Sequence, residues 1–348
     1  MRCTRREVLQ GALALGAVGV LGGCARLPEV RVGIAFGTQP LWRYAAARKA
    51  ALEQATGTRL SFLAYASEGE LRRAFRSGQL EVIATQPTQL PLLRGEVGPL
   101  QFFLALAWVA ESLPLIVAAD APFSRLDDLT GKRLAILGSD DPGLAYWRAF
   151  VLALTGTRLE DRLHLVSGIE NPGLAILNGT VEAAVVNSGL WVSYKASGRF
   201  RAVMDLGQAW NEVSRGQPPL VFGGYVARQE WLAANRPVVE ALARLTREGF
   251  ERFVADPAEF GRVVAEFQQP ASGAPGVVAV AAQQPEQALA IARFLGMDVV
   301  TAQRLHLAEG DIAAYRLVFE LLARAGYLPA PVGESSALFL SGVLGARG

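Results

Sequence analysis

The sequence predicts an α/β protein with two lobes, each a mainly parallel sheet flanked by helices, followed by a helical C-terminal segment. The chain has 348 residues, about twice the length of a typical domain. Hydrophobic residues make up 51% of it and charged residues 19%, so large cores are expected and a disordered chain is excluded. Short strand-like runs alternate with helical runs, as they do in parallel sheets covered by helices.

The first lobe opens with an alternating series of strands and helices. Gly57 and Gly78 follow the two helices, and glycine commonly stands just after a helix C-terminus. This β-α-β-α-β order favours a parallel sheet, because parallel strands need a crossover connection between them. The five segments are strands 30–35, 59–65 and 80–84 and helices 41–56 and 68–76.

A second series of the same kind predicts the second lobe, and a last apolar strand returns the chain to the first. The chain therefore crosses between the lobes near residues 108–113 and 217–221, which makes a hinge natural. We assign residues 28–110 and 222–340 to lobe 1 and residues 111–221 to lobe 2. The further strands are 115–118, 133–137, 164–166, 181–186 and 220–227, and the further helices are 126–132, 144–155, 172–178, 229–254, 257–267, 286–295, 299–307 and 312–325.

The N-terminus has the features of an export signal over residues 1–23. The pair Arg5-Arg6 precedes an apolar run from Gly11 to Leu21, an arrangement typical of twin-arginine export. The run is too short to span a bilayer comfortably, which takes about 20 residues. Residues 21–24 read Leu-Gly-Gly-Cys, which resembles the lipobox of bacterial lipoproteins; a plain secretory signal is the alternative. The lipobox interpretation predicts a lipid on Cys24 and a membrane-anchored body in the periplasm or on the cell surface.

Composition excludes several other classes of protein. Lys and Arg number 34 against 32 Asp and Glu, and the small excess lies in the first 23 residues, so no nucleic-acid partner is expected. Two histidines, His164 and His306, and two cysteines, Cys3 and Cys24, are too few for a cysteine- or histidine-rich metal site. No cofactor is expected. The sequence also lacks Gly-x-Ser-x-Gly, His-Glu-x-x-His and a phosphate-binding loop. We therefore expect a binding protein and not an enzyme.

Three stretches carry a family resemblance. Residues 127–136 read DDLTGKRLAI, residues 175–186 read AILNGTVEAAVV and residues 323–329 read ARAGYLP. In this order they resemble the substrate-binding lipoproteins of bacterial ABC importers, in the subgroup for nitrate, sulfonate, taurine and thiamine-pyrimidine precursors. The likeness extends from about Val30 to about Pro331. It implies the type II periplasmic binding protein fold.

The resemblance also implies a function and partners. The protein would capture a small organic solute (a sulfonate, nitrate or an aminopyrimidine-like compound) by hinge closure, as a monomer, and deliver it to an ABC permease subunit. Two alternatives stay open. One is a ligand-sensing lipoprotein that signals to a membrane receptor, and the other is an exported enzyme on the same scaffold.

A ligand site is expected where the strands end, because open α/β sheets bind ligands outside the carboxyl ends of their strands. Several candidates there have structural alternatives: Trp42 and Trp191 as core residues, and Thr38, Ser67 and Ser139 as helix N-caps. The candidate ligand-binding residues are Thr38, Gln39, Trp42, Ser67, Gln86, Thr88, Trp108, Ser139, Asp140, Asn187, Trp191 and Tyr225.

Asp140 and Asp141 bear on the charge of the ligand. Two carboxylates at a strand end repel an anion and favour a ligand with a cationic or donor-rich part, to which Glu68 and Glu111 would add. Alternatively, they only stabilise the N-terminus of the following helix through its dipole. A neutral heterocycle that stacks on tryptophan and bonds to Asn187 and Gln86 is the third interpretation.

Overall fold

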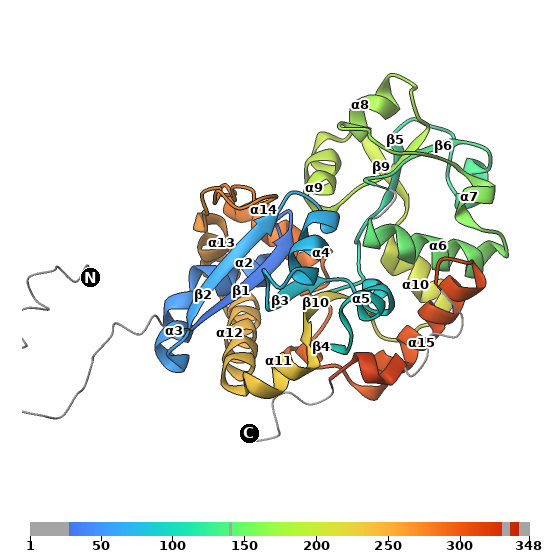
Figure 1. Ribbon diagram of the computed structural model, residues 1–348. Coiled ribbons are helices and arrows are strands. Elements are labelled where there is room, and N and C mark those ends of the chain that lie inside the picture. Colours follow the sequence, from blue (N-terminus) through green and yellow to red (C-terminus); the bar gives the residue numbers. More distant parts are fainter. Residues whose placement is uncertain (1–27, 139–140, 329–334, 341–348) are drawn as a thin grey trace, which may run out of the picture.

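The computed structural model describes residues 28–138, 141–328 and 335–340. The predicted export signal, Cys24, Ser139 and Asp140 lie outside these residues. Figure 1 shows two α/β lobes side by side, each built on its own five-stranded sheet. Sheet A has the strand order β2-β1-β3-β10-β4, and sheet B has the order β7-β6-β8-β5-β9. The predicted two-lobed α/β fold is confirmed.

Sheet A is the centre of lobe 1. Strands β1, β2 and β3 are parallel to one another, whereas β10 runs antiparallel to both β3 and β4. Four of its strands therefore point the same way, and the sheet is mainly parallel as predicted. The strands are β1 (Glu29–Ala35), β2 (Arg59–Tyr65), β3 (Val82–Thr85), β4 (Leu100–Trp108) and β10 (Val221–Arg228).

Helices cover sheet A and leave one end of its strands facing the other lobe (Figure 1). Helix α4 packs on β1 and β3, α5 packs on β4, and α12 and α13 pack on α2. The helices of this lobe are α2 (Pro40–Ala47), α3 (Lys49–Thr56), α4 (Glu68–Arg76), η1 (Pro87–Gln89), α5 (Leu90–Val97), α11 (Gln229–Ala234), α12 (Arg236–Ala255), α13 (Pro257–Glu266), α14 (Pro285–Phe294) and η3 (Ala302–Leu305).

Sheet B repeats this plan in lobe 2. Strands β6, β7 and β8 are parallel, and β5 is the single antiparallel strand, placed between β8 and β9. Its strands are β5 (Leu115–Ala118), β6 (Arg133–Ala135), β7 (His164–Val166), β8 (Ala183–Val185) and β9 (Phe200–Met204). Its helices are η2 (Leu126–Leu129), α6 (Pro142–Thr155), α7 (Leu159–Arg162), α8 (Pro172–Leu177), α9 (Ser188–Ser197) and α10 (Leu206–Ser214).

Several elements differ from those predicted. The helix expected over 41–56 breaks at Arg48, where neither glycine nor proline marks the break. The helix expected over 229–254 is divided at the start of α12, because Pro237 there cannot donate an N–H to the preceding turn. The helix expected over 299–307 shrinks to the short η3. Strand β4 was not predicted because its residues are almost all buried and apolar, without the alternation typical of a half-buried strand.

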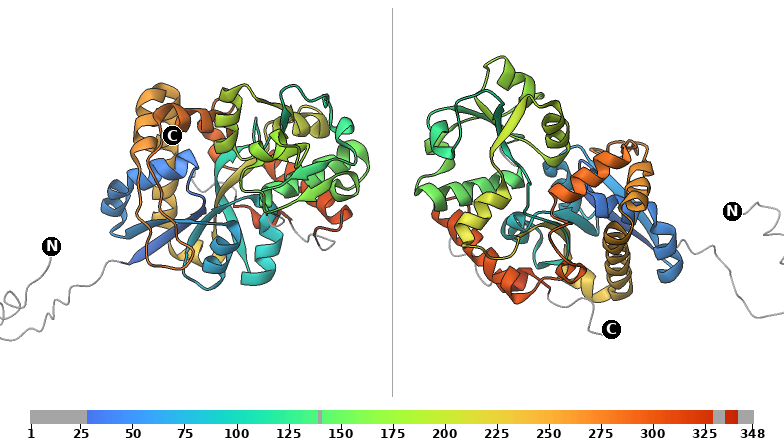
Figure 2. Two further views of the ribbon diagram at one scale, coloured as in Figure 1. Left: turned by 90° about the horizontal axis from the view of Figure 1, so that it is seen from above. Right: turned by 180° about the vertical axis from the view of Figure 1, so that it is seen from behind.

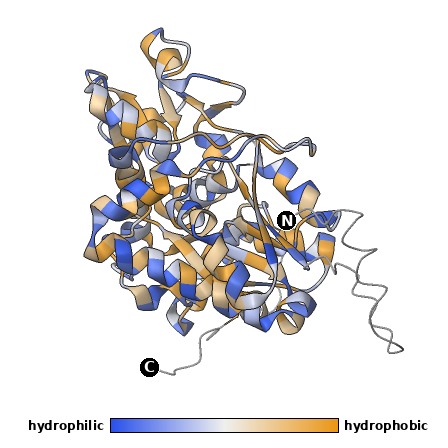
Figure 3. Ribbon diagram, turned by 90° about the vertical axis from the view of Figure 1, so that its left-hand side faces the viewer, coloured by the Kyte–Doolittle hydropathy of each residue, from blue (hydrophilic) through white to orange (hydrophobic). Residues whose placement is uncertain are grey.

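Apolar side chains from the strands and the inner helix faces form the cores. Four tryptophans, Trp42, Trp108, Trp147 and Trp210, are almost completely buried. In Figure 3 the strands are mostly hydrophobic, whereas the helices carry residues of both kinds along their turns. In the described ranges of the chain, no helix is both long and apolar enough to cross a membrane.

The same ion pair recurs in the two lobes. Arg31 donates to the Glu81 carboxylate from Nε, Nη2 and its backbone N–H, at 3.1, 2.5 and 2.8 Å. Arg133 and Glu182 repeat these three bonds at 3.2, 2.6 and 2.8 Å. In sheet order β1 corresponds to β6 and β3 to β8. Each ion pair therefore links an inner strand to the residue that precedes the neighbouring strand. The two lobes have the same local arrangement.

The pair in lobe 2 makes stability depend on pH. The hydrogen bonds from Arg133 lower the pKa of Glu182 from 4.5 to about 2. A carboxyl whose pKa is lowered on folding stabilises the protein above its unfolded pKa, and this contribution is lost as the pH falls through the folded value. We expect Glu182→Gln to lower the melting temperature by about 2 °C at pH 6, and the gap to the unsubstituted protein to close between pH 4.5 and 2. Calorimetry across this range checks it, and a gap that stays constant to pH 2 contradicts it.

Two neighbouring crossovers join the lobes. The chain leaves sheet A after β4 and returns to it at β10, and the two passages are bonded to each other by Val109 N–H and the Leu220 carbonyl at 2.7 Å. Trp147 on α6 donates its indole N–H to the Leu113 carbonyl at 3.0 Å, and Leu113 has a positive φ of 44°. The first crossover is therefore held in an unusual backbone conformation by a buried helix of lobe 2.

The C-terminal segment touches both lobes, although the sequence placed it in lobe 1. Helix α15 (Glu309–Arg324) packs on α6 of lobe 2, as the views in Figure 2 show. The buried hydroxyls of Tyr146 and Tyr315 are 2.9 Å apart, and Tyr315 donates to the Val221 carbonyl at the second crossover. Leu340 N–H then bonds to the Phe102 carbonyl of β4 at 2.9 Å. The apolar face of α15 therefore packs against lobe 2. The assignment of the lobe boundaries stays a prediction.

Candidate ligand-binding site

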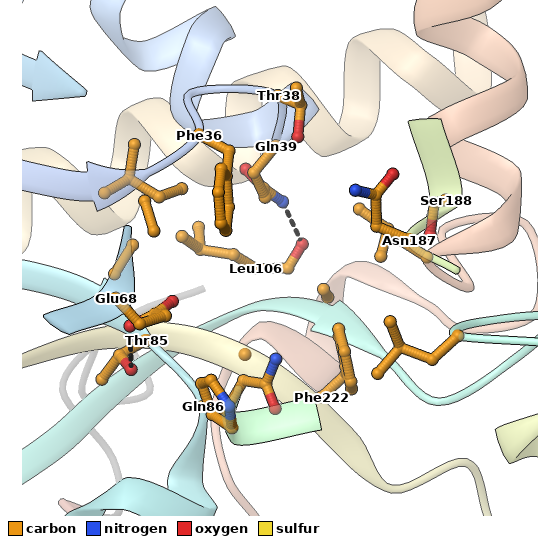
Figure 4. Close-up of a pocket in the computed structure, with 18 of the residues that line it drawn as sticks. Phe36, Thr38, Gln39, Glu68, Thr85, Gln86, Leu106, Asn187, Ser188 and Phe222 are labelled. Carbon is orange, nitrogen blue, oxygen red and sulfur yellow. Dashed lines mark hydrogen bonds between the residues drawn. The ribbon is translucent and has the colours of Figure 1, made fainter. Parts of the chain in front are cut away.

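A cavity of about 160 Å³ lies between the two sheets. Side chains from both lobes face it (Figure 4). Lobe 1 contributes the ends of β1 and β3, parts of β4 and β10, and α14; lobe 2 contributes the segments after β6 and β8. The lining residues are Ile34, Ala35, Phe36, Thr38, Gln39, Glu68, Ala84, Thr85, Gln86, Leu106, Ala107, Leu113, Leu137, Asp141, Pro142, Asn187, Ser188, Gly189, Phe222, Gly223, Gly224, Ile291 and Leu295.

Four of the predicted site residues line this cavity: Thr38, Gln39, Gln86 and Asn187. Gln39 is held at both ends of its amide, because Oε1 accepts from the N–H of Trp42 at 2.5 Å and Nε2 donates to the Leu106 carbonyl at 2.6 Å. Asn187 caps α9 by accepting from the N–H of Leu190 at 2.9 Å. The position of these four residues just after strands therefore predicted which side chains of the two lobes meet at the cavity.

The four aromatic candidates lie in the cores instead. Trp42, Trp108 and Tyr225 are fully buried, Trp191 is almost so, and none of them lines the cavity. Large aromatic side chains gain most when they are enclosed on all sides, so the core position given above as the alternative for Trp42 and Trp191 is the observed one, and Trp108 and Tyr225 are buried in the same way. Burial also raises the pKa of Tyr225, which keeps its hydroxyl protonated.

The remaining candidates lie beside the cavity or outside the described residues. Ser67 caps α4 by accepting from the N–H of Glu70 at 3.2 Å, which is its structural alternative. The buried hydroxyl of Thr88 donates to the Pro142 carbonyl at 3.2 Å, so it joins lobe 1 to the start of α6. Ser139 and Asp140 are not described, but their neighbour Asp141 lines the cavity.

Two phenylalanines line the cavity although no sequence motif marks them. Phe36 follows β1 and is 55% exposed, and Phe222 lies on β10 against the ring of Tyr146. Phe36 has a positive φ of 63° and stands at the centre of a three-residue turn closed by Gly37 N–H and the Ala35 carbonyl at 2.9 Å. The one signal for Phe36 in the sequence is its position immediately after a strand.

The charges at the cavity are acidic. Glu68 accepts from the Thr85 hydroxyl at 3.4 Å, and Asp141 caps α6 by accepting from the N–H of Gly143 at 2.7 Å. Among the described lining residues there is no lysine, arginine or histidine. Arg72, one turn along α4 from Glu68, donates to Gln89 at 3.0 Å and is not part of the lining. No cluster of three or more potential metal ligands occurs in the described part of the chain.

Two α/β lobes joined by paired crossovers around a shared cavity define the class of extracytoplasmic solute-binding proteins. Residues 44–256 match the family model for the periplasmic substrate-binding protein of phosphonate ABC transporters. The chain belongs to this family, and it is the periplasmic substrate-binding component of an ABC importer. The family resemblance identified from the sequence is confirmed at this level. A search of the curated proteins found no match.

Solved structures with the same fold are distant in sequence. The alkanesulfonate-binding protein SsuA of Xanthomonas axonopodis pv. citri, bound to MOPS, is 17% identical, with 91% of this chain and 99% of that chain covered and a TM-score of 0.66. The periplasmic aliphatic sulphonate binding protein SsuA of Escherichia coli is 14% identical, covering 87% and 94%, with a TM-score of 0.62. The desulfurization enzyme DSZB is 15% identical, covering 89% and 96%, with a TM-score of 0.56. At these identities the likeness concerns the fold.

Proposed function

We propose that the cavity between the sheets captures one small organic solute, that the lobes close on it, and that an ABC permease receives it unaltered. The observation that carries this proposal is the lining, since Gln39 and Gln86 come from lobe 1 and Asn187 and Ser188 from lobe 2. A solute that touches both lobes favours the closed arrangement by its extra affinity for it. The resemblance and the relatives named above suggest phosphonates, sulfonates, nitrate or aminopyrimidine-like rings, which differ in charge.

Binding without chemistry is proposed over catalysis. The described lining contains no histidine or cysteine, the residues that most often supply a general base or a thiol nucleophile. DSZB shows that an enzyme can have this fold, but the family to which the chain belongs consists of binding proteins. A solute recovered unchanged after long incubation with the protein is the expected result.

Asn187→Ala tests the cavity with a matched control. The substitution removes a cavity side chain and the cap of α9, and we expect at least a tenfold loss of affinity for any solute that binds, about 1.4 kcal/mol. Asn171→Ala removes the equivalent cap of α8, where Asn171 accepts from Leu174 N–H at 2.9 Å away from the cavity. Each change removes a helix cap worth about 1 kcal/mol. Asn171 also accepts from the Tyr194 hydroxyl at 3.3 Å, but only Asn187→Ala removes a side chain of the cavity.

The measurement combines a screen with a shape assay. A thermal-shift panel of anions, amines and heterocycles identifies a binder, since a solute at 100 times its Kd adds about 2.7 kcal/mol. Titration calorimetry then compares the two variants, and small-angle scattering records the expected fall in the radius of gyration on binding. Equal losses in both variants, a radius that does not change, or conversion of the solute would contradict the proposal.

We further propose that Cys24 carries a lipid and that the protein is a monomer. Cys24 is the one cysteine at the end of the apolar N-terminal run, and a lipid there would keep the solute near the permease by raising its local concentration. In cells, Cys24→Ala should move the protein from the membrane fraction to the soluble fraction. Retention in the membrane fraction would refute the anchor, and a dimer in size-exclusion chromatography would refute the monomer.

A further inference from the structure

We infer that the cavity takes a planar ring that bears hydrogen-bond donors and no negative charge, such as an amino-substituted or amidinium-bearing aromatic compound. This inference rests on the proposed function, because it names the solute that the same cavity accepts. It excludes the anionic solutes named above, which are phosphonates, sulfonates and nitrate. Four features of the lining lead to it: charge, capped helix N-termini, amide side chains and aromatic walls.

The first feature is the sign of the charge. Glu68 and Asp141 are the charged side chains among the described lining residues, and both are acidic. A phosphonate or a sulfonate placed there would lie beside carboxylates with no lining cation to offset its charge. In a partly water-excluded site this like-charge repulsion costs more than it does at the surface.

The second feature is that the helix N-termini at the cavity are already capped. Free N–H groups at such ends are common anion sites, but Gln39, Asp141 and Asn187 each accept a hydrogen bond from an N–H of the helix that they precede. Helices α2 and α6 also begin with Pro40 and Pro142, which have no N–H to donate. The helix ends therefore offer an anion few free donors.

The third feature is the arrangement of the amide side chains. The Gln86 Oε1 atom is buried and accepts no hydrogen bond from a described residue, and in Figure 4 its Nε2 atom faces the cavity while the Glu68 carboxylate lies apart from it, beside Thr85. The amide of Gln39 is already paired at both ends. Across the cavity Asn187 directs its Nδ2 group inward (Figure 4). A ring with an acceptor between Gln86 and Asn187 and a donor toward Glu68 matches this pattern, since buried polar groups require partners.

The fourth feature is a pair of phenylalanine walls. Phe36, in the turn after β1, and Phe222, on β10, lie on different sides of the cavity (Figure 4). The left-handed backbone of Phe36 is unfavourable for a non-glycine residue, and such strain is retained mainly at functional sites. The ring is also 55% exposed, so packing alone does not account for it. Aromatic faces favour flat ligands, and they attract cations.

Three probes of similar size separate the possibilities by calorimetry. Benzamidine is a planar cation, benzenesulfonate is the same ring with the opposite charge, and cyclohexylamine is a cation without a flat ring. We expect benzamidine to bind at least tenfold more tightly than either of the others. Tighter binding of benzenesulfonate, or of methylphosphonate, overturns the inference and leaves the proposed capture function standing. Absence of binding by benzamidine and by 2-aminopyrimidine also overturns it, while the scattering assay with other solutes still tests capture.

Two substitutions test whether the side chains of Glu68 and Phe36 cause the preference for benzamidine. Glu68→Gln should weaken benzamidine binding about tenfold and leave benzenesulfonate unchanged or improved. Phe36→Gly removes the ring and relieves the positive φ, so affinity should fall at least tenfold while the melting temperature holds or rises. Val254→Ala, at a 64% exposed position on α12, is the control and should change neither. If benzamidine affinity is the same in all three variants, the roles assigned to the Phe36 ring and the Glu68 charge are wrong.

Discussion

Replacing Arg43 by methionine will lower the free energy of unfolding by about 3–5 kcal/mol. Arg43 is 1% exposed, and its guanidinium donates to the carbonyls of Val264, Gly37, Phe267 and Ala281 at 2.9, 3.3, 2.6 and 2.9 Å. Burial lowers its pKa to about 10, so it remains charged at neutral pH. Methionine has a similar length but no donors, and four carbonyls would lose their partner.

Urea denaturation of the purified protein measures this loss. Arg48→Met is the matched control, since Arg48 is half exposed and makes a 3.8 Å ion pair with Glu259 and a 5.9 Å contact with the Tyr44 ring, but no side-chain hydrogen bond to a carbonyl; a change within about 0.5 kcal/mol is expected there. Arg43 also bonds the turn that carries Phe36, so solute affinity should fall with stability in Arg43→Met. A loss below about 1 kcal/mol would show that the carbonyls find other partners.

Substituting Gly224 by alanine should destabilise the protein by about 3 kcal/mol or more. Gly224 lies in β10, between β3 and β4, and an added Cβ would be 2.1 Å from the Leu104 carbonyl oxygen and 2.3 Å from the Phe102 ring. A strand paired on both sides cannot shift without breaking its hydrogen bonds. Because Gly224 also lines the cavity, any shift of β10 will alter the site.

The neighbouring glycine supplies the control for stability. At Gly223 the nearest atom to an added Cβ is the Thr85 carbonyl oxygen, at 3.6 Å, which is an ordinary contact. We expect Gly223→Ala to change the free energy of unfolding by less than about 1 kcal/mol. Chemical denaturation compares the two variants, and equal losses would show that the close approach at Gly224 is not the cause.

Local sequence predicted the secondary structure correctly where a residue type has a single physical role. The strand at 59–65 was predicted with its observed bounds, because turn and helix signals flank it. Thr38, Gln39, Gln86 and Asn187 line the cavity because strand ends in such sheets meet at one edge; their role in ligand binding stays a prediction. Predictions about aromatic residues did not hold in this way. Nothing local distinguishes Trp42, which lies in the core, from Phe36, which lines the cavity, because both follow the same strand.

The order of amino acids was sufficient for the α/β class, the two lobes, the family and four residues of the cavity lining, since these depend on periodicity and on short signals at element ends. Only the packed molecule shows which residues of the two lobes line one cavity and that α15 contacts lobe 2. Each of these brings together residues that are far apart in the chain, such as Tyr146 and Tyr315. Their meeting depends on how complete helices and sheets bury their apolar faces, and local patterns do not encode this.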